Sequence, residues 1–176
     1  LSGKNCLITA GPTHENIDPV RFISNKSSGK MGMAIAEELS DKGAKVTLIM
    51  GPSNLTSNHP NIKQINIVSA EEMYNEVDSY FNNSDISVFT AAVSDYKSKK
   101  VFTEKVKKSE ENWSLSLEKN KDILQTMSLR KNKNQFVVGF ALETVNEIEN
   151  AKAKLKKKKL DLMVLNSTKD KGATFS

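Results

Sequence analysis

The chain has 176 residues, of which 38% are hydrophobic and 27% charged, with a net charge of +5 at pH 7. This length is typical of one domain, and the positive charge favours an anionic partner without choosing among nucleic acid, nucleotide and membrane surface. The single cysteine excludes a disulfide within the chain, and no apolar stretch reaches the ~18 residues that cross a bilayer. No signal-peptide pattern opens the chain, so we expect a cytoplasmic protein without a membrane segment.

The two ends of the sequence do not resemble natural termini. The chain begins at Leu1 without a methionine and stops at Ser176, shortly after the polar segment 166–172. We therefore expect residues 1–176 to form a single nucleotide-binding domain that is a fragment of a longer protein.

Six apolar runs predict the strands. Most of them are continuous runs of Val, Ile, Leu and Phe rather than alternating patterns, as expected for parallel strands covered on both faces. The predicted strands are residues 5–10, 45–50, 64–68, 86–92, 136–141 and 162–165.

Four helical patterns lie between these runs. The first begins at Met31 and is stopped by Gly43, and Ser69 is an N-cap candidate for the second. The second, third and fourth predicted helices are residues 70–82, 122–130 and 146–159. This alternation predicts a doubly wound, mostly parallel α/β sheet of the Rossmann-like class.

One segment, residues 99–119, breaks the alternation of strands and helices. Short apolar steps lie on both sides of the turn-like residues 109–112, which predicts a β-hairpin. Because the hairpin follows the carboxyl end of a strand, where such sheets bind ligands, we expect it to act as a flap.

The opening loop contains the segment DPVRFISNKSSGKMG, residues 18–32. The loop is far longer than the roughly two to six residues that a strand-to-helix turn needs. Ser27, Ser28 and Gly29 stand directly before a helix, where free backbone N–H groups and the helix dipole attract an anion. On the pattern alone, a loop that merely caps the helix is an equally good interpretation.

Two familiar nucleotide motifs do not fit this loop. The GxGxxG fingerprint is absent after the first strand, which counts against a nicotinamide dehydrogenase, and Gly29-Lys30 lacks the rest of a Walker A motif. Metal-ligand spacings and a Ser-His-Asp arrangement are also absent around His14 and His59. A site of lysines, amides and one aspartate instead predicts chemistry by charge stabilisation of phosphates.

Further polar residues follow strand ends at the same edge of the predicted sheet. Asp95, after the fourth strand, could bind a ribose or a metal ion, or simply pair with a lysine. Lys105 stands in the flap, where a cluster of lysines suits triphosphate charge but could also be a solvated edge that deters strand pairing.

The last predicted helix carries a run of lysines, residues 152–159. Lys154 and Lys158 border a narrow apolar stripe that contains Ile148 and Ala151, so we expect both lysines to point toward the sheet. A nucleic-acid surface would prefer a broad basic face with aromatic platforms, yet only 6% of the residues are aromatic and none lies in this run. The pattern therefore disfavours nucleic acid as the partner.

Six segments of the chain together resemble the phosphopantothenoylcysteine synthetase domain of coenzyme A biosynthesis. The similarity runs from about Lys4 to Phe175, and the segments are ITAGPTHENIDPVRFISNKSSGKMG, TAAVSDY, EKVKK, NKDIL, VGFALET and LDLMVLNS. The resemblance implies that this domain follows a flavin-dependent decarboxylase in one bifunctional chain, with no flavin in the domain itself.

The resemblance also implies a ligase reaction in two steps. The carboxylate of 4′-phosphopantothenate attacks the α-phosphate of CTP, which gives an acyl-cytidylate and pyrophosphate, and the amine of L-cysteine then displaces CMP. Mg²⁺ accompanies the triphosphate, and the family members are homodimers. An ATP-using relative and a non-catalytic nucleotide-binding module are the alternatives.

Residue roles are implied by the same resemblance. Asn25 is similar to the residue that holds the acyl-cytidylate, Lys105 to a flap lysine on the phosphates, and Asp95 to an aspartate beside the cytidine or the metal. Arg21, Asn25 and Ala91 are the implied substrate contacts. The implied nucleotide-binding residues are Gly11, Ser27, Ser28, Gly29, Lys30, Phe89, Thr90, Ala91, Asp95, Lys105, Lys121, Asp122, Ile123, Leu124, Phe140, Lys154 and Lys158.

Overall fold

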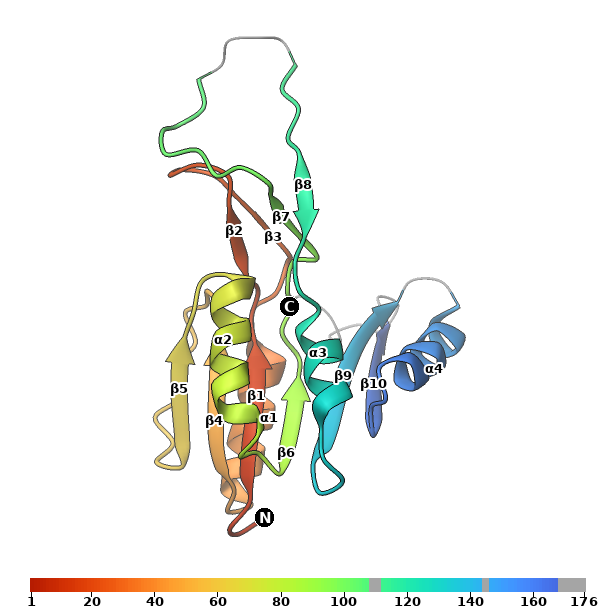
Figure 1. The fold of residues 1–176 in the computed structure, drawn as a ribbon. Coiled ribbons are helices and arrows are strands. Elements are labelled where there is room, and N and C mark those ends of the chain that lie inside the picture. The colour runs from red at the N-terminus through yellow and green to blue at the C-terminus, as the bar shows by residue number, and fades with distance from the viewer. Residues whose placement is uncertain (108–111, 144–145, 168–176) are drawn as a thin grey trace.

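The computed structural model describes residues 1–107, 112–143 and 146–167, and its centre is a six-stranded parallel sheet (Figure 1). The strand order is β10-β9-β6-β1-β4-β5. The strands are β1 Asn5–Ala10, β4 Lys45–Met50, β5 Ile62–Asn66, β6 Ile86–Phe89, β9 Phe136–Glu143 and β10 Leu162–Ser167. The chain moves outward from β1 to β5, returns to β6, and then moves outward the other way. The predicted doubly wound sheet is confirmed, and its switch point lies between β1 and β6, where such sheets bind ligands.

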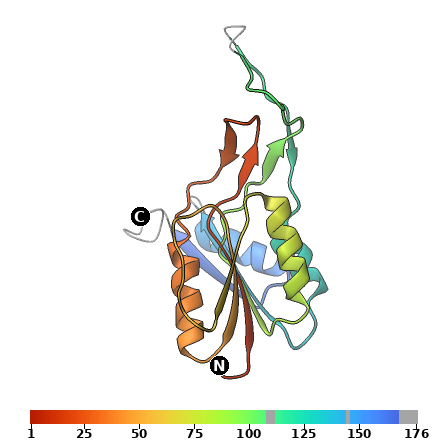
Figure 2. The same cartoon turned by 90° about the vertical axis from the view of Figure 1, so that its left-hand side faces the viewer.

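Four helices among the described residues cover the two faces of the sheet (Figure 2). They are α1 Lys30–Asp41, α2 Ala70–Phe81, α3 Ile123–Arg130 and α4 Glu147–Lys157. The Ser69 hydroxyl accepts the Glu72 N–H and caps α2, and α1 ends just before Gly43, which has a φ of 89°. Both predicted helix boundaries are confirmed.

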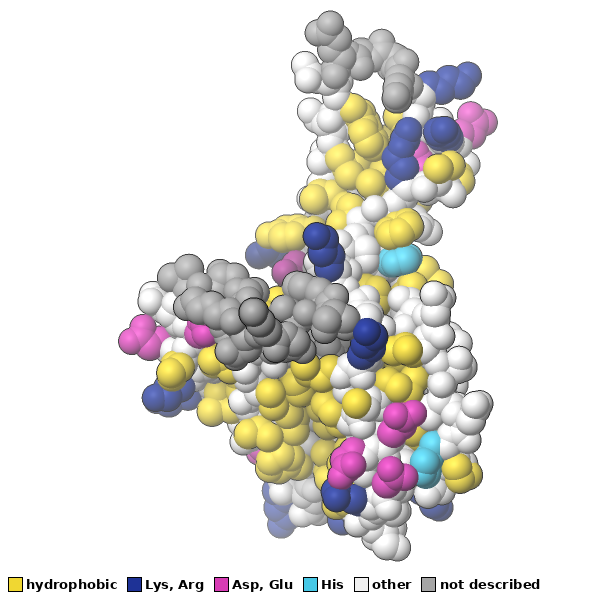
Figure 3. Space-filling view, turned by 180° about the vertical axis from the view of Figure 1, so that it is seen from behind, with side chains coloured by type: hydrophobic (Ala, Val, Ile, Leu, Met, Phe, Trp, Pro, Cys, Tyr) yellow, Lys and Arg dark blue, Asp and Glu magenta, His cyan; other side chains and the backbone are white. Residues whose placement is uncertain are grey.

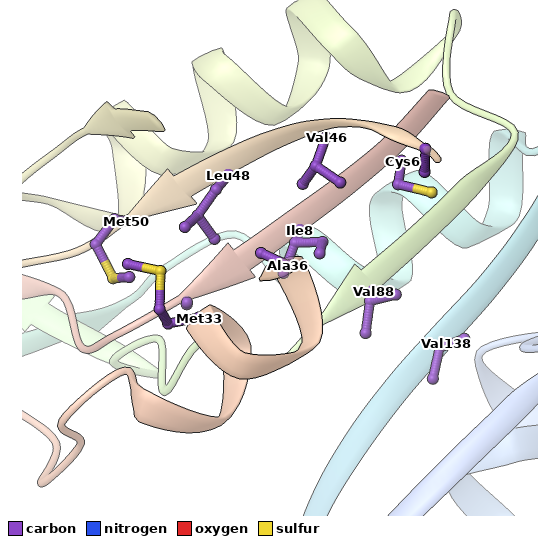
Figure 4. Close-up of a cluster of buried hydrophobic side chains, with 11 residues drawn as sticks. Cys6, Ile8, Met33, Ala36, Val46, Leu48, Met50, Val88 and Val138 are labelled. Atoms are coloured by element: carbon purple, nitrogen blue, oxygen red, sulfur yellow. The ribbon is translucent and has the colours of Figure 1, made fainter. Parts of the chain in front are cut away.

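Apolar clusters lie on both faces of the sheet. On one face, Met33 and Ala36 of α1 pack over Ile8, Leu48 and Met50 (Figure 4). The same cluster contains the buried Cys6, so the only cysteine is a core residue. On the other face, side chains of α2 and α3 pack on β1, β4, β6 and β9, with Leu155 of α4 at the margin of that cluster.

Several element bounds differ from the sequence predictions. β5 begins and ends two residues before the predicted 64–68, and β9 and β10 each run two residues further than predicted. β6 stops at Phe89 instead of residue 92; beyond it, an isolated parallel bridge between Pro12 and Ala92 remains, and the Ala92 N–H donates to the Gly11 carbonyl. The predicted stripe of α4 is wrong at Ile148, which is 63% exposed, whereas Ala151 is buried.

Two short antiparallel pairs stand on the carboxyl edge of the sheet and form an arm (Figures 1 and 2). One pairs β2 His14–Asn16 with β3 Phe22–Ser24, inside the opening loop, where we predicted no strands. The other pairs β7 Tyr96–Ser98 with β8 Leu117–Lys119, which is the root of the predicted flap.

Among the described residues, the antiparallel ladder of the flap covers only its root, β7 with β8, extended by the bond from the Lys99 N–H to the Ser116 carbonyl, so it is shorter there than the hairpin predicted over residues 99–119. Beyond Lys99, the outgoing segment bonds to the opening loop: Phe102 N–H donates to the Ile17 carbonyl and Val106 N–H to the Asp18 carboxylate. Most of the turn expected at residues 109–112 lies outside the described residues. Within the described part of the chain, no helix is long and apolar enough to cross a bilayer.

Candidate functional site

A cavity of about 990 Å³ opens at the carboxyl ends of β1, β6 and β9, beside the root of the arm. Its volume is in the range of cavities that bind small molecules and cofactors. The predicted site residues that line it are Gly11, Asn25, Ser27, Ser28, Gly29, Lys30, Phe89, Thr90, Ala91, Asp95, Lys121, Asp122, Ile123, Leu124, Phe140 and Lys158. Segments that lie more than 130 residues apart in the sequence thus meet in one cavity, from Gly11 to Lys158.

Three predicted residues lie outside the described lining of the cavity: Arg21, Lys105 and Lys154. The guanidinium of Arg21 donates to Asp18 Oδ2 at 2.7 Å and to the Val106 carbonyl at 3.2 Å, so it joins the opening loop to the flap. Lys105 and Lys154 are exposed.

The N-terminus of α1 faces the cavity without a side-chain cap. Gly29 is the N-cap residue, with a φ of 79°, and no side chain bonds to the free N–H groups in good geometry, the Ser28 hydroxyl standing 3.5 Å from the Lys30 nitrogen. The first turn carries no acidic residue and begins with Lys30. Free N–H groups, the positive end of the helix dipole and a lysine together favour an anion here.

Three glycines perform the tasks of the dinucleotide-binding fingerprint, although the contiguous GxGxxG motif is absent. Gly11 makes the tight turn after β1 with a φ of 76°, and Gly29 opens α1. At Gly32, an added Cβ would lie 2.4 Å from Ala10 Cβ and 2.5 Å from Thr90 Oγ1, so this glycine allows α1 to pack closely on β1 and β6. The fingerprint gives the tight turn to its first glycine and the close helix–strand packing to its third; its second lets the backbone approach a pyrophosphate, for which Gly29 at the start of α1 is the candidate. The intervening residues 12–28, which include β2 and β3, therefore split the fingerprint rather than remove it.

The loop after β6, residues 90–95, forms the middle of the cavity wall and is held by three other segments. Ala92 N–H donates to the Gly11 carbonyl, and Ser94 N–H donates to Thr13 Oγ1 at 3.1 Å. The side-chain amide of Asn25 donates to the carbonyls of Ala92, at 3.3 Å, and Val93, at 3.0 Å. The third contact is Asn120, which bonds to Ser94 and Asp95.

The N-terminus of α3 forms the opposite wall of the cavity and, unlike that of α1, is capped. Asp122 Oδ1 accepts the Gln125 N–H at 2.9 Å, and Asp122 Oδ2 pairs with Lys158 Nζ at 2.7 Å. The ammonium of Lys121 lies 4.4 Å from the centre of the Tyr74 ring. Because its helix end is already satisfied by a carboxylate, this wall is less suited to an anion than the α1 end.

A buried carboxylate ties the opening loop to the flap. Burial raises the pKa of Asp18, but N–H bonds from Val20, Val106 and Arg21, together with the Arg21 charge, lower that pKa overall. The Arg21 guanidinium also lies 5.9 Å from the centre of the Trp113 ring, on the returning side of the flap. The DPVR segment therefore fixes the position of the flap residues next to Lys105.

Sequence reasoning missed several residues that shape the site: Asp18, Gly32, Thr13 and Asn120. Gly32 had a weak signal, because a glycine inside a helix often marks a close approach of backbones. Thr13 and Asn120 lie in segments that the sequence singled out, but their bonds to Ser94 could not be predicted, since this partner lies 81 and 26 residues away in the sequence.

The fold and the cavity define a class: a doubly wound α/β domain with a crevice at its switch point, into which the uncapped N-terminus of α1 opens. The family described as the DNA/pantothenate metabolism flavoprotein C-terminal domain matches residues 1–176, and the chain belongs to this family.

Curated relatives cover nearly the whole chain. The coenzyme A biosynthesis bifunctional protein CoaBC of Haemophilus influenzae is 48% identical over 166 residues, which are 94% of this chain and 41% of that protein. CoaBC of Bacillus subtilis is 46% identical, covering 99% of this chain and 43% of its own length. A cysteine/cysteine sulfinic acid decarboxylase from an unknown prokaryotic organism is 46% identical over 99% of this chain and 49% of its length. The chain thus spans about half the length of these relatives, or less.

Solved structures agree with this assignment. The crystal structure of the C-terminal domain of CoaBC is 42% identical, with a TM-score of 0.82 over 94% of this chain and 78% of that one. The DNA/pantothenate metabolism flavoprotein from Streptococcus pneumoniae is 25% identical, with a TM-score of 0.82 over 94% of this chain and 82% of that one.

Proposed function

We propose that this chain is the ligase domain that joins 4′-phosphopantothenate to L-cysteine at the expense of CTP, a step of coenzyme A biosynthesis. Its membership of the family and its 48% identity to CoaBC support the proposal. CTP and 4′-phosphopantothenate are both phosphorylated, and an uncapped helix end and a set of lysines suit phosphate groups.

One observation carries the proposal. The segments of four motifs, ITAGPTHENIDPVRFISNKSSGKMG, TAAVSDY, NKDIL and VGFALET, converge on the same cavity although they are dispersed in the sequence. Beside the phosphate site, the proposed reaction also needs neutral donors and acceptors that hold the carboxylate and the acyl intermediate. Asn25 and the loop after β6 provide such a group at the centre of the cavity wall.

In the first step, the substrate carboxylate attacks the α-phosphate of CTP, and the bond to the β-phosphate breaks to release pyrophosphate. Two anions must approach each other, so the surrounding groups have to offset their repulsion. The free N–H groups of α1 and the lysines Lys26 and Lys30 line the cavity, and they would offset this repulsion. Lys105 of the flap would add a further charge when the flap covers the nucleotide.

In the second step, the L-cysteine amine attacks the acyl carbon and CMP leaves with the former carboxylate oxygen. Asn25 is a neutral donor, so it can stabilise an acyl-phosphate oxygen without adding charge. Its amide is engaged by the Ala92 and Val93 carbonyls, and we infer that one of these bonds is exchanged for the intermediate.

A magnesium ion fits the residues of the cavity. Among the described residues, no cluster of three or more metal-ligating side chains exists, and the carboxylates of the described lining are Asp95 and Asp122. Asp122 is committed to the α3 cap and to Lys158, which leaves Asp95 to hold the ion. Mg²⁺ typically keeps several waters and binds through one or two carboxylates plus substrate phosphates, whose charge it neutralises.

We also propose a homodimer that buries the arm, fused to a flavin-dependent decarboxylase domain in the longer protein. Large apolar side chains of the arm are exposed, including Val20 at 60%, Val101 at 57% and Trp113 at 50% (Figure 3 shows hydrophobic side chains gathered there). A second copy of the arm would cover this surface.

Pyrophosphate release tests the proposed function. The full-length protein is incubated with CTP, Mg²⁺ and 4′-phosphopantothenate without L-cysteine, and the same reaction is repeated with ATP. We expect pyrophosphate with CTP that depends on 4′-phosphopantothenate. Pyrophosphate release with ATP but not with CTP would identify the protein as an ATP-using relative. CTP binding without any pyrophosphate release would identify it as a non-catalytic nucleotide-binding module.

A further inference from the structure

We propose that Asn120 is a positioning residue that fixes Asp95 in place for the nucleotide and joins the root of the flap to the cavity wall. The inference rests on the proposed function, because it assigns a task within the same cavity. It concerns a residue that none of the implied substrate or nucleotide contacts includes.

The contacts of Asn120 are the first support. Its side-chain nitrogen Nδ2 donates to the Ser94 carbonyl at 2.9 Å, and its backbone N–H donates to the Asp95 carbonyl at 2.9 Å. One residue thus satisfies two consecutive carbonyls of the loop that carries Asp95.

The division of the loop is the second support. Its N-terminal half is held by the Gly11 carbonyl, which accepts the Ala92 N–H, and by Asn25, which donates to Ala92 and Val93. In its C-terminal half, Thr13 accepts the Ser94 N–H, while both carbonyls that we find bonded there depend on Asn120. Asn120 thus holds the two carbonyls on either side of the step from Ser94 to Asp95, directly before the pairing of Tyr96 with Lys119 begins.

The place of Asn120 in the chain is the third support. It directly follows β8, the returning strand of the flap, and stands two residues before Asp122, the N-cap of α3. Lys119 and Lys121, its two neighbours, also line the cavity. A displacement of the flap root would thus be transmitted to Asp95 through two hydrogen bonds.

The chemistry of the side chain explains why an amide is needed. Alanine would leave the Ser94 carbonyl without this donor, and Asp would place a negative oxygen against the carbonyl oxygen. Glutamine keeps the donor one methylene further along, so it should restore part of the effect.

The test is steady-state kinetics on the full-length protein with Asn120→Ala, Asn120→Gln and Asn83→Ala. Asn83 is an exposed asparagine at the opposite edge of the sheet and serves as the matched control. For Asn120→Ala we expect the KM for CTP to rise about three- to tenfold, which corresponds to the loss of one neutral hydrogen bond. We expect kcat and the KM for L-cysteine to stay within about twofold of wild type. Asn120→Gln should lie between Asn120→Ala and wild type.

A double-mutant cycle with Asp95→Asn separates positioning from general stability. If Asn120 acts through Asp95, then adding Asn120→Ala to Asp95→Asn should raise the KM for CTP by less than about twofold. Additive effects, an unchanged KM for CTP, or a fall in kcat with all KM values unchanged would each overturn the inference. A wild-type protein that releases no pyrophosphate would refute the proposed function instead, so the two failures are distinguishable.

Discussion

At the scale of single residues, Asn25 has a structural task as well as its proposed catalytic one. Its side-chain amide donates to the carbonyls of Ala92 and Val93 in the loop after β6. Asn25→Asp would put carboxylate oxygens against those carbonyls and remove the neutral donor proposed for the intermediate. We expect product formation to fall by ~10²- to 10³-fold while the melting temperature changes little.

The measurement for Asn25→Asp is formation of 4′-phosphopantothenoylcysteine beside CTP affinity by calorimetry. The matched control is Asn61→Asp, which makes the same chemical change at an exposed position before β5. Turnover of Asn25→Asp within a few-fold of wild type would reduce Asn25 to an ordinary loop residue.

Gly32 provides a second prediction at the scale of residues, because packing and helix propensity change the stability of Gly32→Ala in opposite directions. Propensity alone predicts that Gly32→Ala stabilises α1 by about 1 kcal/mol. The added Cβ would, however, meet Ala10 Cβ at 2.4 Å and Thr90 Oγ1 at 2.5 Å, and such overpacking costs about 1–3 kcal/mol. We expect net destabilisation in urea unfolding and weaker CTP binding, because the N-terminus of α1 must move off the sheet edge.

Ala34→Gly, at an exposed position of the same helix, measures the propensity contribution separately. A Gly32→Ala protein that is more stable than wild type would show that α1 does not pack as closely as described.

At the scale of elements, α4 and α3 meet through Lys158 and Asp122. Lys158 lines the cavity with its side chain 20% exposed, whereas Lys157, its neighbour, is exposed. We expect Lys158→Ala to weaken CTP binding about tenfold, because it removes a charge at the cavity and frees the Asp122 carboxylate beside the nucleotide. Lys157→Ala should change the affinity by less than about twofold, and equal losses in both variants would indicate a diffuse basic surface.

The central elements could be predicted from the sequence because they are buried. The predicted bounds of β1 and β4 are those of the structure, since continuous apolar runs leave little choice of position. The Ser69 cap was equally local, because its partner Glu72 is three residues away.

The arm could not be predicted with the same success. β2 and β3 are three residues each, too short for a periodic signal, and the flap bonds to the opening loop through Phe102 and Val106 rather than to itself. The two flap contacts join partners more than 80 residues apart, which no local pattern reports.

The residues of the cavity could likewise be predicted only in part. The sequence placed the loops at the correct edge, since the carboxyl ends of parallel strands share one side of the sheet. It did not reveal that Gly11, Gly29 and Gly32 act together, because residues 12–28 separate the first from the other two.

At the scale of the whole molecule, Asp85 joins the beginnings of β1 and β6. It accepts the Asn5 N–H at 2.9 Å and a bond from the Lys4 ammonium at 2.9 Å. The Asn5 bond above all, and then the Lys4 bond, lower the pKa of the Asp85 carboxyl below its ordinary value. A carboxylate whose pKa is lower in the folded state stabilises the fold above the unfolded pKa, and that contribution disappears as the pH falls through the folded pKa.

We therefore expect the free energy of unfolding in urea to fall as the pH drops below about 4. Asp85→Asn should be less stable than wild type at pH 7, and its free energy of unfolding should fall less steeply at acidic pH. Glu37→Gln, at an exposed carboxylate of α1, should keep the wild-type dependence of stability on acidic pH. Parallel pH curves for Asp85→Asn and wild type would exclude Asp85 as a contributor.

The most direct test of the proposed ligase reaction follows the oxygen of the substrate carboxylate. The full-length protein is given CTP, L-cysteine and 4′-phosphopantothenate labelled with ¹⁸O in its carboxylate, and the products are analysed by mass spectrometry. If the carboxylate attacks the α-phosphate and L-cysteine then displaces CMP, one labelled oxygen must appear in CMP and none in pyrophosphate. Label in pyrophosphate or in inorganic phosphate, or product formed with unlabelled CMP, would contradict the acyl-cytidylate and with it the function proposed for this cavity.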